Sequence, residues 1–181
     1  MRRRFVLVPV LLLAATIVLA PSPARAYEHQ WHIGGALGYA LTIDPTYNGF
    51  GGGVHLTYGL TDAFNAMVEL DLTAHPGADA LVGSGSIGAG YVLDILEWVP
   101  YVGLMAGVYD FFSYGGGCGG KGEPGCIATR IGFSVPVGLD YLVSRSLAIG
   151  VAGRYHILPI GGDSTTQYLT VFARAEYIWG F

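Results

Sequence analysis

The chain has 181 residues, of which 52% are hydrophobic, 12% are charged and 29 are glycine. Nine Lys and Arg stand against thirteen Asp and Glu, so no basic surface can displace phosphate counterions, and we expect no nucleic-acid partner. Frequent Tyr, Phe and Trp together with few helix signals favour a β-rich protein.

The N-terminus has the three parts of a secretory signal peptide. Residues 1–4 are basic, residues 5–20 are apolar and uncharged, and residues 24–26 form a small-x-small cleavage site. A membrane anchor is the alternative, but the apolar part is short for a bilayer span of about 20 residues. We therefore expect a cleaved leader at 1–26 and one domain at 27–181, in which five basic and thirteen acidic residues leave a net charge of about −8.

The remaining chain contains eight segments in which apolar side chains alternate with small or polar ones. Their approximate ranges are 30–42, 50–60, 64–73, 82–93, 99–110, 127–139, 147–157 and 169–181. A period of two is typical of β-strands, because successive side chains point to opposite faces.

In the first four segments the two faces separate clearly. The apolar faces are formed by Trp31, Ile33, Leu37, Tyr39 and Leu41; by Val54, Leu56, Tyr58 and Leu60; by Phe64, Ala66, Val68, Leu70 and Leu72; and by Ile87, Ala89, Tyr91 and Leu93. The opposite faces carry His32, Gly34 and Gly38; Gly51, Gly53, His55 and Thr57; Asn65, Met67, Glu69 and Asp71; and Ser84, Ser86, Gly88 and Gly90.

The fifth segment is ambiguous, whereas the last three are clear. In the fifth, Val102, Leu104, Ala106 and Val108 suit lipid, but Tyr101, Met105 and Tyr109 on the other face are apolar too. The later apolar faces are Thr129, Ile131, Phe133, Val135, Val137 and Leu139; Ile149, Val151, Tyr155 and Ile157; and Leu169, Val171, Ala173, Ala175, Tyr177, Trp179 and Phe181.

These segments predict an all-β fold, an eight-stranded antiparallel up-and-down transmembrane β-barrel. After residue 26 no apolar run reaches helix-spanning length, and a lipid-facing chain without one satisfies its backbone only in a closed barrel. Each segment has about the nine to eleven residues of a membrane-crossing strand. The connections alternate between short (60–63, 94–98, 140–146) and longer (43–49, 74–81, 111–126, 158–167). A soluble ligand-binding barrel is the alternative, although its polar face would consist mainly of Gly, Ala and Ser.

The last strand carries a specific resemblance. Tyr177, Trp179 and Phe181 place aromatic rings at alternate positions up to the final residue. This resembles the closing strand of bacterial outer-membrane β-barrels, in which such a terminus is the signal for the barrel-assembly machinery. The chain as a whole resembles the small eight-stranded outer-membrane proteins of the OmpA transmembrane-domain and OmpX type. The resemblance implies an outer-membrane location, with outer-membrane lipids, lipopolysaccharide and the assembly machinery as partners.

The inward face suggests a closed lumen. An eight-stranded barrel encloses only enough space for side chains. Three acidic and three basic residues are expected inside: Glu69, Asp71, Glu176, Arg130, Arg154 and Arg174. Because buried charges are tolerated when paired, we predict a salt-bridge network that plugs the lumen, with His32, His55 and His156 as hydrogen-bonding partners. A thin or gated channel is the alternative.

An enzyme is the other alternative. The sequence Arg154-Tyr155-His156 is similar to part of the catalytic stretch of the outer-membrane lipid A deacylase, but no serine stands two places after His156 to act as the nucleophile. We therefore expect no enzyme, no cofactor and no metal site.

The longer loops hold the remaining features. Cys118 and Cys126 are the only cysteines, and in an oxidising compartment we expect them to form a disulfide. A zinc site is the alternative, but it would lack nearby histidines. Acidic residues predominate over Lys121 in the loops: Asp44, Asp79, Asp110, Glu123 and Asp163. Aromatic residues near the rim (Tyr47, Phe50, Phe111, Phe112 and Tyr114) suit an aromatic belt at the membrane surface, or an adhesive surface whose ligand the sequence does not specify.

Overall fold

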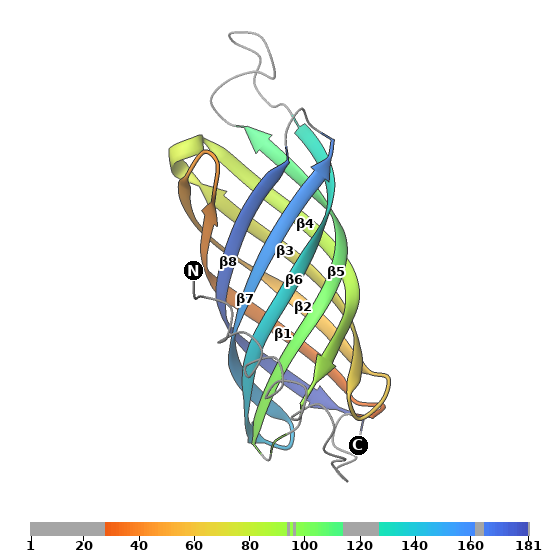
Figure 1. Ribbon diagram of the computed structural model, residues 1–181. Coiled ribbons are helices and arrows are strands. Elements are labelled where there is room, and N and C mark those ends of the chain that lie inside the picture. Colours follow the sequence, from red (N-terminus) through yellow and green to blue (C-terminus); the bar gives the residue numbers. More distant parts are fainter. Residues whose placement is uncertain (1–27, 94, 96, 114–126, 162–164, 181) are drawn as a thin grey trace, which may run out of the picture.

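The computed structural model describes residues 28–93, 95, 97–113, 127–161 and 165–180 (Figure 1). These residues form a closed barrel of antiparallel strands in chain order, and β1 pairs with β8 to complete it. The strands are β1 (Trp31–Thr42), β2 (Tyr47–Gly59), β3 (Phe64–His75), β4 (Ala80–Val92), β5 (Trp98–Ser113), β6 (Ile127–Ser144), β7 (Leu147–Ile160) and β8 (Thr166–Trp179). The short 3-10 helix η1 (Pro76–Ala78) joins β3 to β4. The predicted fold class is confirmed.

Across the described part of the chain, no helix has both the length and the apolar character to cross a membrane.

All strands except β1 are longer than predicted. They have 12 to 18 residues, because ladder pairing continues past the apolar stretch. The connections expected at 43–49 and 140–146 therefore shrink to 43–46 and 145–146, and Asp110, Phe111 and Phe112 belong to β5 rather than to a loop. Hydrophobic alternation marks the part of a strand that crosses lipid, not the whole strand.

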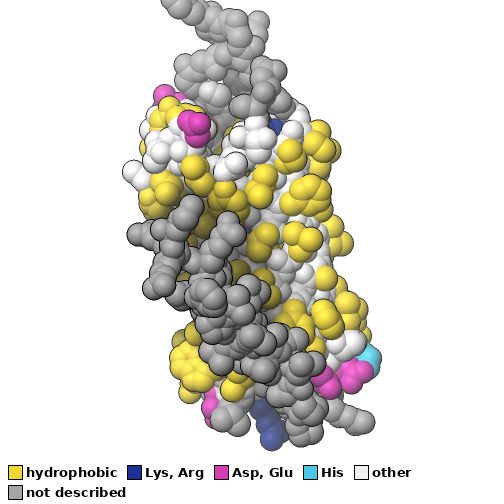
Figure 2. Space-filling view, in the orientation of Figure 1, with side chains coloured by type: hydrophobic (Ala, Val, Ile, Leu, Met, Phe, Trp, Pro, Cys, Tyr) yellow, Lys and Arg dark blue, Asp and Glu magenta, His cyan; other side chains and the backbone are white. Residues whose placement is uncertain are grey.

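The apolar face points outward, as a membrane barrel requires. Leu37 is 74% exposed, Leu104 61% and Ile87 65%, all on strand faces. Figure 2 shows apolar side chains over the visible wall, with charged side chains near its two ends. The ambiguity of β5 is resolved, because Tyr101, Met105 and Tyr109 are buried inside while Leu104 and its outward neighbours are exposed. A soluble ligand-binding barrel would have the opposite arrangement.

A ring of aromatic side chains surrounds the end that carries the β2–β3, β4–β5 and β6–β7 turns. Its ring pairs have centroid separations of 4.6 to 6.3 Å. Neighbouring strands pair Trp31 with Tyr58 and Trp179, Phe64 with Tyr91, and Trp98 with Tyr141, and within β8 Tyr177 pairs with Trp179. Trp and Tyr favour the level of lipid head groups. The sequence singled out Tyr177 and Trp179 at this end, whereas the other members of the belt are a finding of the structure.

Candidate functional site: the barrel lumen

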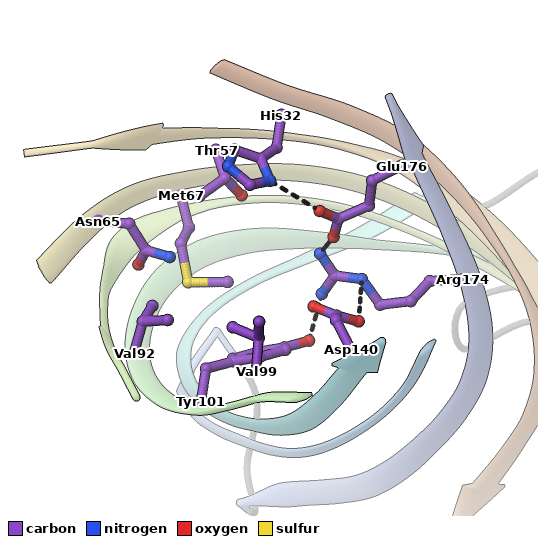
Figure 3. A pocket seen from close by; sticks show the side chains of 10 residues that line it. All are labelled: His32, Thr57, Asn65, Met67, Val92, Val99, Tyr101, Asp140, Arg174 and Glu176. Atoms are coloured by element: carbon purple, nitrogen blue, oxygen red, sulfur yellow. Dashed lines mark hydrogen bonds and ion pairs between the residues drawn. The ribbon is translucent and has the colours of Figure 1, made fainter. Parts of the chain in front are cut away.

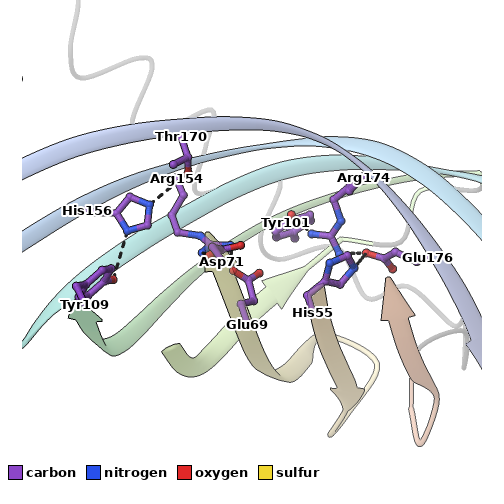
Figure 4. A network of polar contacts seen from close by, with 10 residues as sticks. All are labelled: His55, Glu69, Asp71, Tyr101, Tyr109, Arg154, His156, Thr170, Arg174 and Glu176. Atoms are coloured by element: carbon purple, nitrogen blue, oxygen red, sulfur yellow. Dashed lines mark hydrogen bonds and ion pairs between the residues drawn. The ribbon is translucent and has the colours of Figure 1, made fainter. Parts of the chain in front are cut away.

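Two arginines enter the lumen from the last two strands. Arg154 of β7 forms ion pairs with Glu69 and Asp71 of β3, and its Nη1 lies 2.7 Å from Asp71 Oδ2. β7 and β3 are not neighbouring strands, so this contact crosses the interior (Figure 4). All three side chains are at least 90% buried. We call these three residues the Arg154 cluster.

The second arginine, Arg174 of β8, lies closer to the turn end with the aromatic ring. It pairs with Glu176 on its own strand, and its Nε is 3.5 Å from Asp140 Oδ1 of β6. It also donates to the Tyr101 hydroxyl and lies over that ring, 5.0 Å from the centroid. We call Arg174, Glu176, Asp140 and Tyr101 the Arg174 cluster (Figure 3).

Two histidines lie within hydrogen-bonding distance of the Glu176 carboxylate. His32 Nδ1 lies 3.1 Å from one carboxylate oxygen, and His55 Nε2 lies 3.1 Å from the other. His55 is also the register partner of Glu69 across the β2–β3 ladder, and Figure 4 places it between Glu69 and Glu176. The two clusters are therefore adjacent, with His55 between them.

A third layer is aromatic and lies nearer the opposite end. His156 stacks on Tyr168 with ring centroids 3.9 Å apart and meets the edge of Tyr109 at 5.6 Å. Its ring nitrogens lie 3.3 Å from the Tyr109 hydroxyl and 3.2 Å from Thr170 Oγ1. Tyr109 and the adjacent Leu158 are completely buried and form one cluster with Tyr168.

Glycines on the inward face make room for the network. A Cβ atom added at Gly53 would collide with the Asp71 carboxylate, and one added at Gly150 would collide with Asp140. A Cβ atom added at Gly138 would collide with the Tyr101 ring. The side chains of Asp71, Asp140 and Tyr101 thus lie over glycines of neighbouring strands. Close approach by another group is a common reason for glycine inside a strand.

Little space remains between these side chains. The cavity lined by His32, Asn65, Asp140, Arg174 and Glu176 has a volume of about 10 Å³, which is near the minimum that holds one water molecule. At this level the side chains therefore leave little open space.

The predicted lumen residues are only partly gathered at one place. Glu69, Asp71, Arg154, Arg174 and Glu176 form the two clusters, whereas the guanidinium carbon of Arg130 lies 5.8 Å from the centroid of the Phe111 ring, near the start of β6. Sequence reasoning missed Asp140, because it was assigned to a turn. The signal was present: Asp140 continues the inward alternation of Ser134 and Gly138.

The residues that the sequence offered for catalysis lie inside the barrel. His156 and Ser134 are register partners on β7 and β6, but both are 1% exposed and face the interior. No group of three or more potential ligands suited to a metal ion occurs within the described ranges. The leader at 1–26, the pair Cys118 and Cys126, and Phe181 lie outside the described residues.

No protein-family model and no curated protein sequence matches this chain. Among solved structures, Neisserial surface protein A is similar with a TM-score of 0.64 and 17% identity, over 84% of this chain and 96% of its own. The N-terminal β-barrel domain of Pseudomonas aeruginosa OprF has a TM-score of 0.61 and 11% identity, over 84% and 98%. The outer membrane protein OprG from Pseudomonas aeruginosa has a TM-score of 0.56 and 12% identity, over 86% and 98%. The chain has the fold of small eight-stranded outer-membrane β-barrels, which agrees with the location that the sequence predicts.

Proposed function

We propose that this protein is an integral β-barrel of the bacterial outer membrane with a closed lumen, and that it acts through its surface rather than as a pore or an enzyme. Its role is then in envelope structure or in contacts made by the outer loops. The fold, the exposed apolar wall and the aromatic ring support the membrane location.

The closed lumen rests on one observation, the pairing of both lumen arginines with buried carboxylates on other strands. Arg154 reaches β3 and Arg174 reaches β6. An ion crossing the barrel would have to separate these pairs, and breaking a buried pair costs about 3–5 kcal/mol.

Conductance in planar lipid bilayers tests this proposal. The wild-type barrel should give no steady single-channel steps, whereas Arg154→Ala and Arg174→Ala should each produce them by removing the side chain that fills the lumen. Arg145→Ala is the matched control, since Arg145 is exposed between β6 and β7. A wild-type barrel that conducts as steadily as the lumen variants would show a channel instead.

The proposal that the protein is not an enzyme is tested separately. His156 faces the packed lumen, so a lipid substrate at the outer wall has no route to its ring. Purified barrel incubated with lipopolysaccharide should leave the mass of lipid A unchanged. Loss or gain of an acyl chain, abolished by His156→Ala, would establish a lipid-modifying activity.

Assembly and loop order complete the proposal. The aromatic positions Tyr177, Trp179 and Phe181 would present the closing strand to the barrel-assembly machinery, and outer-membrane lipids with lipopolysaccharide would surround the wall. A disulfide between Cys118 and Cys126 would restrict the longest outer loop.

A further inference from the structure

Each lumen cluster pairs one arginine with two carboxyl groups. Within the two clusters, two guanidinium groups therefore face four acids: Glu69, Asp71, Asp140 and Glu176. The side chains of all six residues are only 3–10% exposed. If every acid were ionised, each cluster would set two negative charges against one positive charge and keep an uncompensated negative charge inside the barrel.

Burial makes such a charge costly. An ionised carboxylate taken out of water needs a partner of opposite charge, and without one it takes up a proton instead. Two carboxyl groups that share one site behave in this way, since one of them keeps a proton while the other is ionised. The excess of acid over base therefore indicates that the lumen retains protons.

In the Arg174 cluster the geometry shows which acid is less well compensated. Glu176 has the close contact with Arg174, and two histidine nitrogens lie 3.1 Å from its oxygens. Asp140 Oδ1 is 3.5 Å from Arg174 Nε, which is longer than a usual N–H···O bond, and it has no hydrogen-bond partner among the described residues. Asn65 Oδ1 also lacks a donor there and lines the same cavity of about 10 Å³ (Figure 3). One water molecule in this cavity can accept a hydrogen bond from a protonated Asp140 and donate one to Asn65.

In the Arg154 cluster the two acids are more nearly equivalent. Both contact the guanidinium group of Arg154, and their register partners on β4 are serines, Ser86 for Glu69 and Ser84 for Asp71. A serine hydroxyl can accept a hydrogen bond from a protonated carboxyl or donate one to an ionised carboxylate. The proton here belongs to the pair of acids rather than to one of them.

The other titratable side chains that face the clusters do not supply the missing positive charge. Within the described ranges they are His32, His55, His156, Tyr101, Tyr109 and Tyr168. Tyrosine is neutral below about pH 10. A neutral histidine donates one N–H to Glu176, whereas a protonated His32 or His55 would place a second cation beside Arg174.

We propose that the lumen holds one proton in each cluster, and that loss of these two protons at alkaline pH opens it. The inference rests on the closed lumen proposed above and adds a regulation to it. With the protons present, each cluster is neutral and its arginine stays paired. Once they leave, two carboxylates compete for one guanidinium group, and their repulsion draws water between the packed side chains.

Infrared spectroscopy tests the protons directly, because a protonated carboxyl has a carbonyl stretching band that a carboxylate lacks. In a detergent without carbonyl groups, the wild-type barrel should show this band at about pH 6 and lose it at about pH 9, since exposed carboxyls are ionised at both values. Asp71→Asn and Asp140→Asn should each remove roughly half of the band, because each leaves one acid for its arginine. The matched control is Asp62→Asn in the exposed β2–β3 turn. Absence of the band from the wild-type barrel would overturn the inference, and this result does not depend on the folding of any variant.

Conductance in planar bilayers tests the opening. The wild-type barrel should be closed at about pH 6 and give steady steps at about pH 9, whereas Asp71→Asn combined with Asp140→Asn should stay closed at both values. A wild-type barrel that loses the infrared band at about pH 9 and remains closed would overturn the opening. Steady steps already at about pH 6, with the infrared band present, would instead contradict the closed lumen on which the inference rests.

Discussion

Replacing Arg174 by Met should destabilise the barrel strongly. Methionine keeps much of the volume of the arginine stem, so the change removes the charge and the hydrogen bonds while leaving little new cavity. What remains is a buried pair of carboxylates, Asp140 and Glu176, whose only cation within the Arg174 cluster has been deleted.

The magnitude follows from that burial. The side chains of Arg174, Asp140 and Glu176 are 3–6% exposed, so water cannot screen the charge that is left. Removing one partner from a buried ion pair costs about 3–5 kcal/mol of unfolding free energy. The same reasoning predicts that Arg174→Met combined with Asp140→Asn and Glu176→Gln recovers most of the loss, because no uncompensated charge remains.

Urea unfolding in phospholipid vesicles, followed by tryptophan fluorescence, measures these changes. The control is Arg145→Met, an exposed position where we expect a change within about 0.5 kcal/mol. If the triple variant were as unstable as the single one, the loss could not come from unpaired charge. A single variant as stable as wild type would show that the cluster is not paired in the membrane.

Three further predictions concern packing, the loop and assembly. Gly150→Ala should cost about 1–3 kcal/mol by overpacking, whereas Gly153→Ala should stay within about 0.5 kcal/mol; equal values in urea unfolding would contradict the packing shown inside the barrel. Cys118 and Cys126 should not react with maleimide in denatured, non-reduced protein, and quantitative labelling would exclude the disulfide. Deleting Phe181 should reduce the folded barrel in isolated outer membranes, detected by heat-dependent gel migration, while refolding of the purified chain in vitro stays close to normal; unchanged levels in cells would remove the assembly role.

Most of the wall could be predicted from alternation alone. A shift of one residue in the pairing register moves every side chain of a strand to the other face of the sheet. A strand with one apolar face can therefore place only that face against lipid. Strand β5 shows the limit of that reasoning, because Tyr101 and Val102 are both apolar. Only pairing decides between them: Tyr101 lies opposite Gly138 on β6, and Gly138 provides the space that its ring fills.

The lumen was less predictable because its contacts join strands that are not neighbours. Alternation indicates that Arg154 and Glu69 both face inward, but strand tilt and stagger decide which inward residues reach the same level. Asp140 illustrates a second limit. It was expected in the 140–146 connection, whereas the ladder between β6 and β7 continues through it and buries the carboxylate beside Arg174.

Glycine occupies two different environments in this barrel, one inside the lumen and one on the outward wall. At Gly53 and Gly150 the absence of a side chain is required by a neighbouring carboxylate. That reason does not apply to Gly35, whose added Cβ atom would have ordinary contacts, although glycine within a strand costs about 0.5–1 kcal/mol relative to alanine. Gly153 has the same freedom on another part of the wall. If both outward glycines serve only strand flexibility, leucine should change the free energy of unfolding equally at either position, whereas unequal changes would show a local role for one of them.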